Sequence, residues 1–208
     1  MFLIGQYDSP FVRRVAIAMR LYGLPFEQRP WSVFGDAEKI APYNPLIRVP
    51  TLVLDDGEVL IESAAILDYL DGLVPPDNAM IARAGDARRH TLKTCALAMG
   101  LADKAVSLFY EGALHREKST VWVERCTRQI AAVLDVLEAE RAPRPGPWWS
   151  GERIGHVDIA VAVALRFLKD AHPGRFEHER WPALAAHSDQ CEALPVFQEI
   201  AQAFSPPA

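Results

Sequence analysis

The stretch Arg48-Val49-Pro50-Thr51-Leu52, followed at a short distance by Ile61-Glu62-Ser63-Ala64, decides the fold of this chain. Pro50 stands where a strand should begin. Because proline cannot donate a ladder hydrogen bond, it marks a sheet edge, a bend or a cis peptide bond. Glu62 and Ser63 stand where a helix should begin, and there free amides and the helix dipole favour a bound carboxylate. Together these features indicate a site that binds a small peptide through its backbone and its charged end.

The first third of the sequence alternates short strand-like and helix-like segments. Ser9-Pro10 opens a helix, because Ser is a good N-cap and Pro fits the first helical position. Asp55-Asp56-Gly57 separates two apolar runs and is typical of a hairpin turn. Strands are expected at 2–5, 26–29, 51–54 and 58–61, and helices at 10–23, 37–41 and 63–73. This order, β-α-β-α-β-β-α, combines a parallel crossover with an antiparallel hairpin.

The proline-containing stretch Val74–Asn78 ends this pattern, and almost no strand signal follows it. Apolar residues then recur at helical spacing. Long helices are expected at 84–114, 119–141 and 157–168, and short helices begin at Trp181-Pro182 and Leu194-Pro195. The domains are therefore expected at 1–75 (α/β) and 84–208 (all-helical), joined by a linker at 76–83.

Length, charge and cysteine content narrow the classes of function. The chain has 208 residues, half of them hydrophobic, and a net charge of −5, so a buried core is expected and nucleic acid is a poor partner. No apolar run is long enough to span a bilayer and no secretory signal is recognised, so a cytoplasmic protein without membrane contacts is expected. The three cysteines and six histidines follow no disulfide or metal-ligand spacing, so no metal is expected.

Four motifs resemble those of the cytosolic glutathione transferase family. They are Ser9-Pro10-Phe11-Val12-Arg13, the nine residues from Asn44 to Leu52, Glu62-Ser63-Ala64-Ala65-Ile66, and Gly155-His156-Val157-Asp158-Ile159. The resemblance covers essentially the whole chain, and Ser9-Pro10-Phe11 is similar to the bacterial serine-type members. It implies a thioredoxin-like N-terminal domain with a mixed four-stranded sheet, then an all-α helical bundle, in a homodimer.

The resemblance also implies glutathione as co-substrate and a role for each residue of the first site. Ser9 matches the hydroxyl that donates a hydrogen bond to the glutathione thiolate. Val49 matches the residue whose backbone pairs with the cysteinyl part of glutathione, and Pro50 matches the cis proline after it. Glu62 and Ser63 match the pair that holds the γ-glutamyl end. The acid takes its ammonium group, and the hydroxyl and amide take its carboxylate.

Asp158 matches the acid of a helix N-capping box that is important for folding. The usual box starts with Ser or Thr three residues earlier, whereas this chain has Gly155. Gly is only about a few tenths of a kcal/mol worse than Ser as an N-cap. Asp158 is still able to accept a hydrogen bond from the Gly155 amide, so half of the box is expected to survive. The departure concerns local stability rather than catalysis.

The identity of the group that activates the thiol has alternatives. Tyr7 lies near the end of the first strand, where some branches of the family place a catalytic tyrosine, and it equally suits an aromatic residue packed between domains. Redox relatives place a cysteine at the start of the first helix, but Asp8-Ser9-Pro10-Phe11 contains no sulfur. Ser9 is preferred, and its purely structural interpretation as an N-cap is compatible with that role.

Further contacts are less specific. Additional candidates for glutathione binding are Phe11, Arg13, Lys39 and Arg48. The three cations are candidates for a contact with the glycine carboxylate of glutathione. An apolar pocket for the electrophile is expected between the Ser9 loop and the long helices. Its candidate lining residues are Phe11, Trp31, Met99, Phe109 and Tyr110, which at helical spacing also suit a core.

The leading hypothesis is an enzyme that binds glutathione, favours its thiolate and transfers the sulfur to a small hydrophobic electrophile. Glutathione-dependent isomerisation, dehalogenation or ether cleavage would use the same first domain. A non-catalytic module that binds apolar ligands or other proteins is the alternative from another class.

Overall fold

Four short strands form one mixed sheet in the computed structural model, which describes residues 1–206. The strands are β1 (Phe2–Ile4), β2 (Glu27–Arg29), β3 (Thr51–Val53) and β4 (Val59–Ile61), in the order β2-β1-β3-β4. The pair β1–β2 is parallel, and the pairs β1–β3 and β3–β4 are antiparallel. The predicted thioredoxin-like arrangement of a parallel crossover and a hairpin is therefore confirmed.

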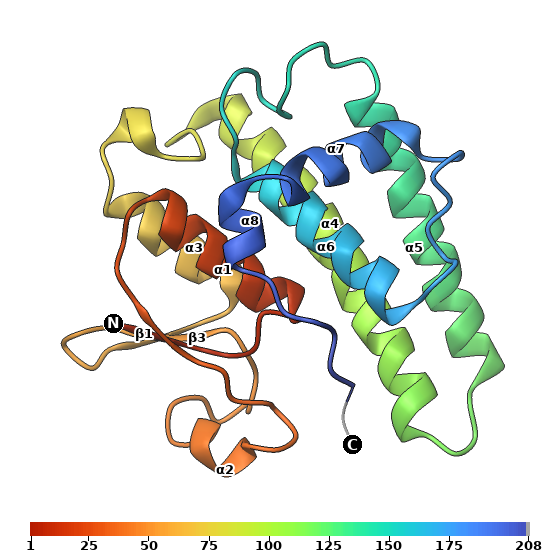
Figure 1. The fold of residues 1–208 in the computed structure, drawn as a ribbon, viewed down its shortest axis with the longest axis horizontal. Helices are drawn as coiled ribbons and strands as arrows, with labels where there is room; N and C mark the ends of the chain where they lie inside the picture. The colour runs from red at the N-terminus through yellow and green to blue at the C-terminus, as the bar shows by residue number, and fades with distance from the viewer. Residues whose placement is uncertain (207–208) are drawn as a thin grey trace. The chain divides into compact units, whose positions relative to one another are not determined.

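Three α-helices of the first unit begin where the local signals predict, and a short 3₁₀ helix lies within the expected linker. They are α1 (Pro10–Leu21), α2 (Ala37–Ile40), α3 (Ser63–Gly72) and the short 3₁₀ helix η1 (Pro76–Asn78). Ser9 caps α1, and Pro10 occupies its first turn, where the missing N–H costs nothing. The side of α1 that carries Val12, Val15 and Met19 is fully buried. Helices α1 and α3 pack against each other (Figure 1).

Helices alone make up the second unit, Ala84–Ala193. They are α4 (Gly85–Leu114), α5 (Thr120–Arg141), α6 (His156–Ala171) and α7 (Pro182–Glu192). Helix α6 is buried on almost every side and contacts α4 and α7, which matches the continuous apolar character of its sequence.

The grouping of residues differs from the expected domains at both boundaries of the first unit. This unit extends to Arg83 and also includes residues 194–206, with helix α8 (Pro195–Glu199). At the first boundary, the amide of Met80 donates a hydrogen bond of 2.8 Å to the Tyr22 hydroxyl, which draws the expected linker onto α1. At the second, α8 packs on α1. The sequence signal at Leu194-Pro195 locates the start of a helix but not the core on which it packs.

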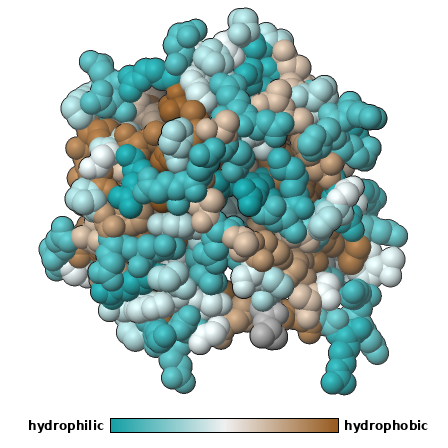
Figure 2. Space-filling view, in the orientation of Figure 1, coloured by the Kyte–Doolittle hydropathy of each residue, from teal (hydrophilic) through white to brown (hydrophobic). Residues whose placement is uncertain are grey.

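The helices and the visible surface are those of a chain with a moderate hydrophobic content. No helix within residues 1–206 combines the length and the hydrophobicity that crossing a bilayer requires. Figure 2 shows hydrophilic side chains over much of one face, interrupted by smaller hydrophobic areas.

Candidate functional site

The ends of β1, β3 and β4 lie side by side at one end of the sheet. Ile4 pairs with Thr51, and Thr51 pairs with Ile61. One step further along this register come Gly5, Pro50 and Glu62. The loop before α1, the start of β3 and the start of α3 therefore meet at the same end of the sheet. These segments carry the predicted site residues Ser9, Val49-Pro50 and Glu62-Ser63.

At this end of the sheet, Gly5 lies very close to Val12 and Val49. Its φ of +132° is rarely adopted by L side chains. A Cβ on Gly5 would lie 2.4 Å from Cγ2 of Val12 and 2.9 Å from Cβ of Val49, which no real structure tolerates without a shift. Glycine at this position thus brings the first turn of α1 within contact of the segment that contains Val49.

Ser9 lies at the start of α1 with a hydroxyl that still has a hydrogen to donate. Its Oγ accepts a long hydrogen bond of 3.5 Å from the amide of Val12, and its side chain is half-buried. A hydroxyl has one donor and two acceptor lone pairs, so this contact leaves the O–H unused. Within residues 1–206 the Ser9 hydroxyl has no other hydrogen-bond partner. It is available to an anion placed beside the helix start.

The Val49–Pro50 peptide bond is cis, as one of the alternatives for Pro50 predicted. The loop that leads to it is held by Asn44, which is 1% exposed. Asn44 Nδ2 donates to the carbonyl of Arg48 and to Oγ1 of Thr51, each at 3.0 Å. Asn44 Oδ1 accepts from the amide of Leu46 at 3.0 Å. Sequence reasoning missed this positioning role, because Asn44-Pro45 by itself indicates only a loop.

Glu62 and Ser63 lead into α3 with an unusual backbone. Glu62 has a φ of 67°, a value that costs a non-glycine residue on the order of 1–3 kcal/mol and is concentrated at functional sites. Its carboxylate lies 3.2 Å from the guanidinium of Arg48, in an exposed ion pair. Ser63 is buried, but its hydroxyl has no partner among the described residues. Because Ser63 is the first residue of α3, its amide is also free of intrahelical bonds.

Tyr7 differs from Ser9 in what surrounds it. Its amide donates to Oε1 of Gln202 at 3.1 Å. Burial raises the pKa of the Tyr7 hydroxyl, and the charges of Arg20 and Glu199 also act on it, in opposite directions. These charges lie at the far end of α1 and at the end of α8. A phenol whose pKa is raised is a weaker acid. The charges that act on Tyr7 are also not those of Arg48 and Glu62 at the candidate site.

The further candidates for glutathione contacts fall into two groups. Arg13 is 3% exposed, and its Nε and Nη2 donate to the carbonyls of Ile200 and Phe197 at 2.7 and 2.8 Å. This buried position is structural, so we correct the expectation of a glycine-carboxylate contact for Arg13. Lys39 is exposed and pairs with Asp36 at 2.6 Å. Arg48, described above, is the candidate cation that adjoins Glu62.

The residues expected to line an electrophile pocket lie in both units. In the first unit, Phe11 is half-buried, and Trp31 packs 6.2 Å from the ring of Tyr43 beside a small core of Ile4, Ile40 and Val53. In the second unit, Met99, Phe109 and Tyr110 are half-buried on α4. Their role in binding an electrophile stays a prediction.

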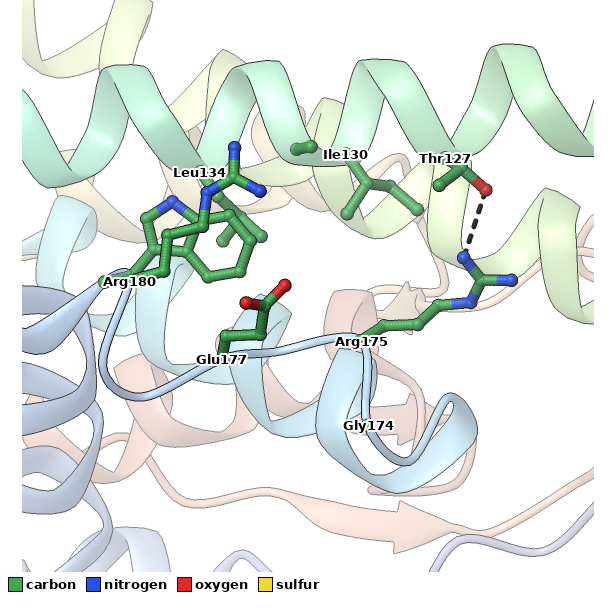
Figure 3. A pocket seen from close by; sticks show the side chains of 9 residues that line it. Thr127, Ile130, Leu134, Gly174, Arg175, Glu177 and Arg180 are labelled. Carbon is green, nitrogen blue, oxygen red and sulfur yellow. Dashed lines mark hydrogen bonds between the residues drawn. The ribbon is translucent and has the colours of Figure 1, made fainter.

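A cavity of about 220 Å³ lies elsewhere in the second unit, between α5 and the loop before α7. Figure 3 shows Glu177 between Arg175 and Arg180, with Arg175 bonded to Thr127 at 3.1 Å. Its floor contains Ile130 and Leu134, which are almost completely buried. None of the predicted site residues lines this cavity, so we do not place the function there.

Asp158 makes the predicted half of a capping box at the start of α6. Its Oδ2 accepts from the amide of Gly155 at 2.8 Å, and its Oδ1 accepts from the amide of Trp149 at 2.7 Å. The side chain is fully buried, and burial raises its pKa to about 6. Gly155 has no side chain to return the bond, so the capping box is reduced to the Asp158 carboxylate, which binds the amides of Trp149 and Gly155.

A search of residues 1–206 finds no cluster of three or more His, Cys, Asp or Glu side chains suited to a metal ion. The three cysteines are buried and form no disulfide with one another.

Comparison with known protein families gives two matches. Residues 3–78 match the model of the glutathione S-transferase N-terminal domain, and residues 120–190 match the model of the C-terminal domain. The first match lies within the first unit and the second within the helical unit.

Individual proteins with related sequences or structures agree with these matches. The GST-like protein YibF of Escherichia coli is 33% identical over 167 residues, which are 80% of this chain and 81% of that protein. The maleylacetoacetate isomerase of Pseudomonas aeruginosa is 27% identical over 98% of this chain and 97% of its own. A glutathione transferase family member from Pseudomonas fluorescens, solved with bound glutathione, is 31% identical with a TM-score of 0.82. It covers 100% of this chain and 99% of that one.

Proposed function

Because the chain belongs to the glutathione S-transferase family, we propose that it binds glutathione, stabilises the thiolate through the Ser9 hydroxyl and transfers the sulfur to a small hydrophobic electrophile. The observation that carries this proposal is the unused O–H of Ser9 at the start of α1. It belongs to the same unit as the cis Val49–Pro50 bond and the start of α3.

The rest of the site supplies the groups that a tripeptide needs. The free hydroxyl and amide of Ser63 suit the α-carboxylate of the γ-glutamyl end, and the Glu62 carboxylate suits its ammonium group. The backbone of Val49 suits the peptide part. Arg48 pairs with Glu62 without ligand, so it is able either to orient that acid or to contact a carboxylate of the ligand.

The energy required of Ser9 is modest. A free thiol with a pKa of about 8.5 is only a few per cent ionised at neutral pH. Lowering this pKa by about two units requires a preference for the thiolate of about 2.7 kcal/mol. A hydrogen bond to a charged group supplies about 1.5–3 kcal/mol, and the start of α1 adds about 0.3–1 kcal/mol. One hydroxyl in this position is sufficient.

Ionisation is not the whole rate effect. The nucleophilicity of a thiolate falls as its pKa falls, with a slope of about 0.4–0.5 in thiol exchange, which cancels much of the gain in thiolate concentration. Holding the electrophile beside the sulfur must supply much of the remaining acceleration. We propose that Phe11, Trp31, Met99, Phe109 and Tyr110 contribute apolar surface for this purpose.

The decisive experiment removes one hydroxyl at a time. Thiolate absorbance is titrated in the glutathione complex, and conjugation is measured with a panel of electrophiles. Ser9→Gly removes the hydroxyl but keeps a residue that is almost as good an N-cap, so the fold is retained. We expect it to raise the thiol pKa by one to two units, about 1.4–2.7 kcal/mol, while Tyr7→Phe has little effect. The reverse result would transfer the role to Tyr7, and a wild-type protein that does not bind glutathione would refute the proposal.

A glutathione-dependent isomerase is the second candidate, because the isomerase of Pseudomonas aeruginosa is similar along nearly the whole chain. In an isomerase the thiolate adds to a double bond and then leaves, so glutathione is not consumed. Incubation with maleylacetoacetate therefore separates the two activities: isomerised product with constant glutathione favours the isomerase, and loss of glutathione favours the transferase. Binding of glutathione without either reaction would favour the non-catalytic module.

We also propose a homodimer, as the family resemblance implies. Size-exclusion chromatography with light scattering measures it directly, and a mass near 23.1 kDa, that of one chain, would contradict it.

A further inference from the structure

The C-terminal segment of the first unit makes its contacts on both sides of the Ser9 loop. We call residues 197–205 the C-terminal strap. This segment begins in the last turn of α8, and Figure 1 shows the chain continuing from α8 past the start of α1. Nothing in the sequence indicates this position, because the strap is separated from the Ser9 loop by almost the whole chain.

The beginning of the strap is firmly held. The buried guanidinium of Arg13 donates to the carbonyls of Phe197 and Ile200, and it also lies 5.5 Å from the centre of the Phe197 ring. Hydrogen bonds from a charged donor are stronger than neutral ones. Phe197 and Ile200 are themselves buried, with exposures of 0% and 1%. The strap therefore leaves a fixed anchor on the first turns of α1.

The rest of the strap contacts the two residues that precede Ser9. The Tyr7 amide donates to Oε1 of Gln202 at 3.1 Å, and Oδ2 of Asp8 accepts from the amide of Ser205 at 3.0 Å. Within the loop itself, the Ser9 amide donates to the carbonyl of Gln6 at 3.2 Å. The loop thus depends on the strap for the bonds that its own turn does not provide.

We propose that the strap is a positioning element for the reaction, and that Gln202 holds the Tyr7–Ser9 backbone so that the Ser9 hydroxyl stays directed at the thiol. This inference rests on the proposed function. Displacement of a reacting group by about 1 Å is able to cost about 100-fold in rate. The Gln202 bond is a single neutral hydrogen bond, so its loss affects the geometry of the loop far more than the stability of the unit.

The test compares two substitutions of one side chain. Gln202→Leu removes the acceptor at nearly constant volume, and Gln202→Glu keeps an oxygen that accepts from the Tyr7 amide. Ala201→Ser, on an exposed neighbour, is the control. Two quantities are measured: hydrogen exchange of the Ser9 amide without ligand, and the pKa of the thiol in the glutathione complex. We expect Gln202→Leu to accelerate exchange about tenfold and to raise the thiol pKa, while Gln202→Glu and Ala201→Ser behave as wild type.

The two readouts separate the two proposals. If Gln202→Leu leaves both the exchange of Ser9 and the thiol pKa unchanged, or if Gln202→Glu is as defective as Gln202→Leu, the positioning role is refuted. If the wild-type protein fails to bind glutathione, the proposed function is refuted, and the exchange of Ser9 alone then decides whether the strap holds the loop. A chain that ends at Ala203 provides a second variant. It loses the Ser205 donor but keeps Gln202, and we expect an intermediate exchange rate.

Discussion

His187 lies against the backbone of Asp158, with its Nε2 at 3.3 Å from the Asp158 carbonyl oxygen and 3.8 Å from Oδ1. Both side chains are completely buried. Burial lowers the pKa of His187 to about 4 and raises that of Asp158 to about 6. The charge of Arg141 also acts on both groups, and Cys191 Sγ lies 3.6 Å from His187 Nε2. The fold thus keeps the imidazole neutral beside the carboxyl.

The pH dependence of stability follows from the sign of each shift. The His187 pKa is lower in the folded protein than in the unfolded chain, so its contribution is present above pH 6.5 and is lost as the pH falls toward 4. The Asp158 pKa is higher in the folded protein, so its contribution is present at low pH and is lost as the pH rises through 6. Over this range the two effects oppose each other.

The His187→Gln variant should lack the His187 contribution to the pH dependence of stability and keep that of Asp158. We expect the difference in unfolding free energy between wild type and His187→Gln to shrink as the pH falls from 6.5 to 4.5, by roughly 2–3 kcal/mol. Urea unfolding at several pH values, followed by tryptophan fluorescence, measures it. His178→Gln, on an exposed loop residue, is the matched control. A difference that stays constant with pH would show that His187 titrates normally in the fold.

Asp158 should be important for the stability of the helical unit. In Asp158→Asn, one of the two amides of Trp149 and Gly155 faces an NH₂ group instead of an oxygen. A buried donor without an acceptor costs about 1–3 kcal/mol, and we expect a loss of this size at pH 7. Asp189→Asn, on the exposed side of α7, should change little. Equal stability of the two variants would show that Asp158 does not stabilise the protein as a capping residue.

Local signals predicted most of the fold and the segments that carry the candidate site residues, but not the contacts that hold these segments in place. Ser9-Pro10, Val49-Pro50 and Glu62-Ser63 are recognisable because capping and proline geometry depend on neighbours in sequence. The roles of Asn44 and Gln202 depend on contacts that form only after folding. A buried Asn in a loop has the same sequence pattern as an exposed one, and a Gln near a chain end has no pattern at all.

Asn44 should be required for the loop before β3. Asn44→Ala leaves the amide of Leu46 without its acceptor, removes the donor to Oγ1 of Thr51 (which keeps only its bond to the Arg48 carbonyl) and opens a small cavity. We expect a loss of about 2–4 kcal/mol in unfolding free energy, measured by chemical denaturation. We also expect weaker binding of glutathione, because the backbone of Val49 follows this loop. Asn78→Ala, in the exposed η1 helix, should affect neither quantity.

Alanine substitutions of Gly5 and Gly57 distinguish the stability cost of steric contact from that of backbone strain. Both have positive φ, at +132° and +91°, but only Gly5 would place a Cβ against Val12 and Val49, whereas nothing lies within 4 Å of a Cβ on Gly57. Gly57→Ala should cost about 1–2 kcal/mol from the backbone alone. Gly5→Ala should cost about 1–3 kcal/mol more through overpacking and should also weaken glutathione binding. Similar losses in both variants would mean that the contact of α1 with the Val49 segment tolerates an extra methyl group.

Ser63 should contribute directly to the affinity for glutathione. Its hydroxyl has no partner within residues 1–206, so Ser63→Ala removes no bond from the unliganded protein, and its stability should change little. A hydrogen bond to a carboxylate contributes about 1.5–3 kcal/mol, so we expect Kd to rise about 10- to 100-fold in calorimetric titration. Ser150→Ala, on an exposed residue of the second unit, is the control. If Ser63→Ala binds glutathione as tightly as wild type, the γ-glutamyl carboxylate is held elsewhere. The start of α3 then has only a structural role.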